Sequence, residues 1–178
     1  MIELPTEVIG FHGTSRSALP RLLAGDIEIS EKPHDWLGSG FYLWQDSPWR
    51  AQEWAIEHHG GEAAVVAVRA RLDDCMDLLN PRWQTLLRDA DAQFVLECLS
   101  EGREVPANRP SGYRARDCAT INWFCDRAAD DGLAVRSVRA IFEEGEPIFE
   151  ASAIRTRSHV QIAIRDRSAI LEAEEISW

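Results

Sequence analysis

Three adjacent residues near the start of the chain carry side chains and main-chain groups suited to ligand binding. They are His12, Gly13 and Thr14 in the stretch "GFHGTS". A neutral imidazole can hydrogen-bond the hydroxyl groups of a ligand, and a threonine adds a hydroxyl of its own. Glycine leaves main-chain N–H and C=O groups open to close approach because it has no Cβ. The alternative is an ordinary turn histidine bonded to the backbone.

Flat side chains cluster in the second stretch, "DWLGSGFYLWQDSPWRAQEWA", around a glycine turn. The face of Tyr42 can stack on a charged ring and add a cation–π interaction. Gly38 and Gly40 allow the backbone to approach a ligand, and Trp44 can form a wall. Alternation along the strand puts Tyr42 and Trp44 opposite Phe41 and Leu43, so one pair is expected to face ligand and the other the core. The alternative is an aromatic core cluster.

A period-two pattern near the end of the chain, "SHVQIAIRD", predicts a strand with two different faces. Val160, Ile162 and Ile164 point one way, whereas His159 and Gln161 point the other way. The Gln161 amide can hydrogen-bond a hydroxyl group but carries no charge. His159 shares its face and is a candidate for substrate contact.

Strands at both ends of the chain and helices between them predict an α+β fold for one domain, residues 1–178. The expected strands are 8–15, 40–44, 63–72, 135–144, 146–151 and 158–172. The expected helices are 15–26, 47–61, 80–102 and 114–132. Ser15 or Ser17 is expected to cap the first helix, and Ser47 and Pro48 to begin the second.

Composition limits the function classes. The net charge is −11, with 30 acidic and 19 basic residues, which argues against a general nucleic-acid binder. Cys75, Cys98, Cys118 and Cys125 match no zinc or redox spacing, so we expect reduced cysteines and no metal. No apolar run is long enough to span a membrane and no secretory signal is visible, so we expect a cytoplasmic protein without a membrane partner.

Taken in order, "GFHGTS", "DWLGSGFYLWQDSPWRAQEWA" and "RSHVQIAIRDRSAIL" resemble the motifs of ADP-ribosyltransferases of the PARP and diphtheria-toxin type. They are most similar to a group of small bacterial toxin-type proteins. The resemblance implies two packed antiparallel sheets that form an NAD cleft, with surrounding helices. It also implies NAD as a substrate, a macromolecular acceptor (protein or nucleic acid), and the role of toxin in a toxin–antitoxin or phage-defence pair, with an antitoxin as a possible partner.

The same resemblance assigns roles to residues of this chain. His12, Tyr42 and Gln161 take the catalytic positions. The NAD-binding positions are His12, Gly13, Thr14, Arg16, Gly40, Tyr42 and Trp44. Many relatives have glutamate where Gln161 stands, so Glu146 or Glu150 is a candidate for the missing carboxylate, although solvated turn acids are the plainer interpretation.

Three alternatives stay open. An NAD glycohydrolase would use water as the acceptor. An RNA 2′-phosphotransferase would need basic side chains to hold RNA, which the net charge of −11 disfavours. A non-catalytic module that binds NAD or ADP-ribose is favoured by the uncharged Gln161, because a charged hydrogen bond contributes roughly 1.5–3 kcal/mol against about 1 kcal/mol for a neutral one.

Overall fold

The computed structural model describes residues 6–110 and 112–177 and is α+β, as expected. Its strands are β1 (Glu7–Ser15), β2 (Phe41–Gln45), β3 (Ala63–Arg71), β4 (Cys75–Asp77), β5 (Ser137–Phe142), β6 (His159–Ile164) and β7 (Ile170–Ile176). Its α-helices are α1 (Leu19–Leu23), α2 (Pro48–His59), α3 (Pro81–Ser100) and α4 (Ala115–Asp130). Two short 3₁₀ turns, Gly60–Glu62 and Arg167–Ala169, precede β3 and β7.

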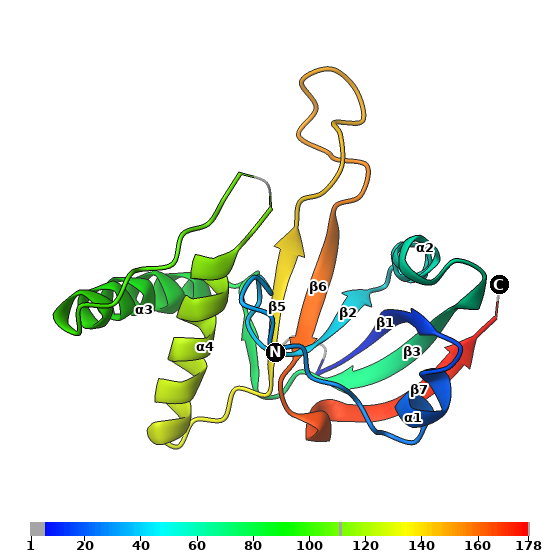
Figure 1. Ribbon diagram of the computed structural model, residues 1–178, viewed down its shortest axis with the longest axis horizontal. Helices are drawn as coiled ribbons and strands as arrows, with labels where there is room; N and C mark the ends of the chain where they lie inside the picture. The colour runs from blue at the N-terminus through cyan, green and yellow to red at the C-terminus, as the bar shows by residue number, and fades with distance from the viewer. Residues whose placement is uncertain (1–5, 111, 178) are drawn as a thin grey trace, which may run out of the picture.

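All seven of these strands belong to one mixed sheet, in the order β4-β5-β6-β2-β1-β3-β7. This corrects the expectation of two packed antiparallel sheets. Continuous pairing of β2 with β6, from Phe41↔Ile164 to Gln45↔Val160, joins the two halves, and β4 runs parallel to β5. Because the sheet twists strongly, β5 and β6 run across the direction of β3 and β7 (Figure 1).

The two faces of the sheet carry different cores. On one face, Phe41, Leu43 and Ile162 pack with Leu19 and Leu22 of α1. We call it the α1 face. On the opposite face, Trp44 and Val65 pack under α2, and Val138, Ala140 and Ala163 pack under Ile121 and Cys125 of α4. We call it the α2 face. The expected alternation of Ile162 and Ile164 against Ala163 is confirmed.

Local signals fix most of the element boundaries. Helix α2 begins at Pro48 after Ser47 and ends before Gly60, as expected, although the Ser47 side chain makes no capping hydrogen bond. Helix α1 is shorter than expected: Ala18 occupies its N-cap position, and the Ser15 and Ser17 hydroxyls bond each other instead.

The expected strand over 146–151 is wrong. This stretch lies in a projecting segment, residues 143–158, that extends away from the sheet between β5 and β6 (Figure 1). The two arms of the segment pair with each other through the bridge Pro147↔Arg155 and a few main-chain hydrogen bonds, one of them from the Arg157 N–H to the Glu144 carbonyl. Apolar residues in this segment, Ile148, Phe149 and Ile154, are exposed, so strand-like composition did not produce a strand where nothing buries the side chains.

The four cysteines are free and buried, so they pack as small hydrophobes, as expected. No helix in residues 6–110 or 112–177 has the length and apolar character needed to cross a membrane.

Candidate functional site

The sheet splits between β1 and β2 beside His12. Pairing of these strands ends at Phe11↔Trp44, whereas β1 continues to pair with β3 as far as Ser15↔Ala63. At the split, His12 Nδ1 lies 2.9 Å from the main-chain oxygen of Tyr42. A carbonyl oxygen only accepts, so Nδ1 carries the proton and donates, leaving Nε2 of the neutral ring as an acceptor.

Burial holds His12 in this neutral form. Loss of hydration lowers the pKa of the imidazole to about 4, and the bond to the Tyr42 carbonyl only partly opposes the shift. Near pH 7 the ring therefore offers one donor, already used, and one acceptor.

Gly13 presents its main chain toward the same split. The Ile9 carbonyl accepts a hydrogen bond from the Asp46 N–H, so alternate residues of β1 direct their N–H and C=O groups toward β2. Gly13 follows this alternation at a point where β2 no longer pairs. A Cβ at this position would collide with the Ala51 carbonyl oxygen of α2 and come within 3.1 Å of the Trp54 ring. The close approach of α2 therefore requires glycine.

The phenol of Tyr42 is tied into the 35–40 turn. Its hydroxyl donates to the Gly38 carbonyl at 2.8 Å and accepts from the Leu37 N–H at 3.0 Å. Gly38 has a φ of 78°, in the region that favours glycine. Burial raises the pKa of Tyr42 far above its ordinary value, so the phenol stays protonated.

A network of Asn122 from α4 and Arg165, which follows β6, also supports this turn. Asn122 Oδ1 accepts from the Ser39 N–H at 2.9 Å and from the Arg165 guanidinium at 2.7 Å. Arg165 also donates to the Ser39 carbonyl at 3.1 Å. The Tyr42 phenol and this network thus both hold the turn.

A Tyr42→Phe substitution should lower the free energy of unfolding by about 2 kcal/mol, because the Leu37 N–H and the Gly38 carbonyl lose their partner. Urea unfolding followed by circular dichroism measures the change. The other tyrosine provides a control: Tyr113→Phe, whose ring lies against His34 and Arg109, should change stability by less than about 0.5 kcal/mol. Equal effects of the two substitutions would contradict the assigned role of the Tyr42 hydroxyl.

Gln161 is half-buried on the α2 face of β6, opposite Trp44 of β2. Its Oε1 accepts a hydrogen bond from the Trp36 indole N–H at 2.5 Å. The amide is therefore held by the same turn that holds Tyr42.

The three side chains expected to line one cleft lie on two faces of the sheet. The His12 ring packs on Phe41, with ring centroids 4.2 Å apart, on the α1 face. Tyr42 packs with the core under α4, and Gln161 shares its face. The reason is register: Phe11, not His12, pairs with Trp44, so His12 points to the opposite side from Tyr42 and Trp44.

The remaining expected binding residues are distributed around this arrangement. Thr14 is buried beside His12, and both line a cavity of about 110 Å³ against α1 and Phe41. Arg16 is exposed and lies 3.7 Å from Glu175. Gly40 pairs with Ser30 and packs on Ala163. Trp44 is only 6% exposed and is buried under α2, so it forms core and no open wall.

Two features at the site were not expected from the sequence. Trp54 of α2 lies beside Gly13 and stacks on His58, with centroids 4.0 Å apart. It stands in the quoted aromatic stretch, but only the fold brings it to β1.

The second is an ion pair between the buried Arg50 of α2 and the half-buried Glu144, with two hydrogen bonds of 2.6 and 3.0 Å. His159 lies beside it, 3.9 Å from Glu144, and donates through Nδ1 to the Arg157 carbonyl. Glu146 and Glu150, considered as catalytic carboxylates, are exposed. No sequence signal marks Arg50 and Glu144 as partners 94 positions apart.

Comparisons of the chain with protein-family models, with curated proteins and with solved structures found no match. Within residues 6–110 and 112–177, no group of three or more His, Cys, Asp or Glu side chains is arranged to hold a metal ion.

Proposed function

We propose that this protein is an NAD-dependent ADP-ribosyltransferase, which cleaves the bond between nicotinamide and ribose and transfers ADP-ribose to a macromolecular acceptor. The single observation that carries the proposal is the split between β1 and β2, where a strand edge with a glycine stands next to a neutral histidine. The order of the three sequence motifs adds support.

The chemistry of the split suits a nicotinamide ring. A carboxamide has one acceptor and two donors, which can pair with the N–H and C=O of Gly13 as a neighbouring strand would. Trp54 beside Gly13 offers an aromatic surface to a cationic ring. His12 Nε2, as an acceptor, can take a hydrogen bond from a ribose hydroxyl on the α1 face.

Tyr42 stands on β2 two residues beyond the last β1–β2 pair, and Gln161 of β6 shares its α2 face. A bent dinucleotide that passes through the split would meet His12 on one side and these two side chains on the other. Positive charge develops on the ribose as nicotinamide leaves, and the Gln161 Oε1 and the Tyr42 ring can stabilise it. Both groups are engaged by the 35–40 turn, so the proposal requires this turn to move when the dinucleotide binds.

Release of nicotinamide from NAD tests the proposal. The native protein, incubated with NAD and a cell extract as the source of acceptors, should release nicotinamide measurable by chromatography. His12→Ala should lower the rate by about 100-fold, because misplacing the ribose by even 1 Å has an effect of that size. His34→Ala, at an exposed histidine, is the matched control and should keep the native rate. If the native protein releases nicotinamide no faster than His12→Ala does, with every acceptor tried, the proposed enzymatic activity is wrong.

A second candidate is a non-catalytic module that binds NAD or ADP-ribose. The observation that favours it is the uncharged Gln161 amide, already bonded to Trp36. Calorimetry distinguishes the two, because the module would bind NAD saturably without turnover and would lose binding in His12→Ala.

A further inference from the structure

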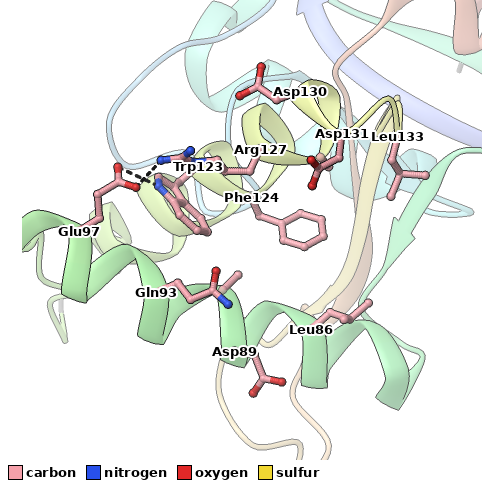
Figure 2. Close-up of a pocket in the computed structure, with 12 residues that line it drawn as sticks. Leu86, Asp89, Gln93, Glu97, Trp123, Phe124, Arg127, Asp130, Asp131 and Leu133 are labelled. Carbon is pink, nitrogen blue, oxygen red and sulfur yellow. Dashed lines mark hydrogen bonds and ion pairs between the residues drawn. The ribbon is translucent and has the colours of Figure 1, made fainter.

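A groove between α3 and α4 lies outside the candidate site. It encloses about 720 Å³ and is lined by one stripe of side chains from each helix. The α3 stripe runs Leu86, Ala90, Gln93 and Glu97, at the spacing of one helical face. Figure 2 shows Phe124 of α4 and Leu133 after it pointing toward the space that Leu86 faces from α3.

The floor of this groove is apolar and accessible. Leu86 is 41% exposed and Leu133 is 51% exposed, while Phe124 and Trp123 are half-buried. Two facing helical stripes with a groove between them resemble the groove into which a third helix packs in a helical bundle. The α3 stripe from Leu86 to Glu97 is roughly 16 Å long, which corresponds to about three turns of a docked helix.

Acidic side chains stand at two margins of the floor. Asp130 and Asp131 lie at its α4 margin and Asp89 on the α3 side (Figure 2). The ion pairs in the described part of this surface join Glu97 to Arg103 and Arg127 and join Asp89 to Arg88 at 3.1 Å, and they leave out Asp130 and Asp131. The Arg127 guanidinium, which lies over the Trp123 ring, is therefore already matched by Glu97.

The position of these aspartates in α4 strengthens the argument. Asp130 is the last residue of the helix and Asp131 is its C-cap, where the helix dipole is negative. Acidic residues at this end are destabilising within the chain, and a cation from a partner would relieve the repulsion. A binding role gives a reason for two adjacent acids at this end.

We propose that the α3–α4 groove binds an amphipathic helix of a partner protein, with apolar residues on one face and Lys or Arg along its flanks. A second copy of this chain fits poorly, because it would bring a net charge of −11 to an acidic rim. Nucleic acid is disfavoured by the same acids and by the apolar floor. This surface is independent of the NAD chemistry proposed above.

Fluorescence anisotropy with synthetic peptides tests the groove on the full chain. The probe is a labelled helical peptide of about four turns with leucines on one face and lysines on its flanks, long enough to cover the stripe. One comparison peptide has glutamates in place of the lysines, and another has the same composition scrambled so that no apolar face forms. The lysine peptide should bind saturably and less tightly at high salt, whereas the other two should not saturate.

Variants localise the binding. Asp130→Lys combined with Asp131→Lys should weaken the affinity for the lysine peptide about tenfold, because it removes the acidic rim. Leu133→Ser should weaken it by a similar factor, because it removes part of the apolar floor. Glu57→Lys with Glu174→Lys, an equal charge change at exposed sites outside the groove, should leave affinity within about twofold. Circular dichroism verifies that each variant is folded. If the variant with both aspartates replaced does not fold, Leu133→Ser alone tests whether the peptide binds in the groove.

Three results would overturn the proposal: equal weakening by the two charge pairs, no effect of Leu133→Ser, or saturable binding of the scrambled peptide. Each would mean that the lysine peptide is attracted by overall charge and is not seated in the groove.

Discussion

Lowering the pH from 6.5 to 4 should reduce the free energy of unfolding of the native protein by roughly 3 kcal/mol more than that of a His12→Asn variant. The cause is the buried imidazole, whose pKa falls to about 4 in the folded protein. Below pH 6.5 the unfolded chain takes up a proton at His12 that the folded chain refuses. Stability is therefore lost as the pH falls through this window, and the His12 contribution levels off below about pH 4.

The measurement is urea unfolding at a series of pH values. Asparagine retains a donor near the position of Nδ1, so the bond to the Tyr42 carbonyl can persist while the titration is removed. Burial also lowers the pKa of His159, but that contribution is present in both proteins and cancels in the difference. His34→Asn should follow the native curve. If the free energy of unfolding depends on pH in the same way for the native protein and His12→Asn, His12 is not held neutral.

Replacing Glu144 by alanine should lower the free energy of unfolding by about 3 kcal/mol, because it leaves a buried guanidinium without its partner. Arg50 is only 8% exposed, and Glu144 accepts two hydrogen bonds from it. The remaining acid, Glu53, lies 3.6 Å away and is half exposed, so it compensates little. The same pair joins α2 to the start of the 143–158 segment, and its loss should also loosen that segment.

Thermal and urea unfolding give the change, and two controls define its origin. Glu53→Ala should reduce stability by less than about 1 kcal/mol, as expected of an exposed ion pair. Arg50→Met combined with Glu144→Leu should recover most of the loss, because no buried charge is then left unpaired. If the double variant is as unstable as Glu144→Ala, packing and not charge explains the effect.

The motif strands and most helix boundaries could be predicted from local residues. Ser47, Pro48 and Gly60 bracket α2, and alternation in "HVQIAI" correctly separates Ile162 and Ile164 from Ala163. These signals work because capping, proline geometry and side-chain alternation act within a few residues. They fail over 146–151, where the chain pairs only with the other arm of its own segment and the apolar side chains stay exposed.

The candidate site was predicted only in part. The sequence identified its three motifs but did not show on which face of the sheet each side chain lies. Alternation within β1 or within β2 says nothing about which residue of one strand lies opposite which residue of the other. The pair Phe11↔Trp44 decides that His12 faces α1 while Tyr42 and Gln161 face the opposite side.

By itself, then, the sequence determined most of the helices and the motif strands, the alternation of side chains along those strands, and the residue types able to bind a ligand, since all of these depend on neighbours along the chain. Only the tertiary structure decided the strand register, the single sheet, the split beside Gly13 and the pairing of Arg50 with Glu144. These depend on contacts between distant segments, where many partners are chemically equivalent and packing selects one of them.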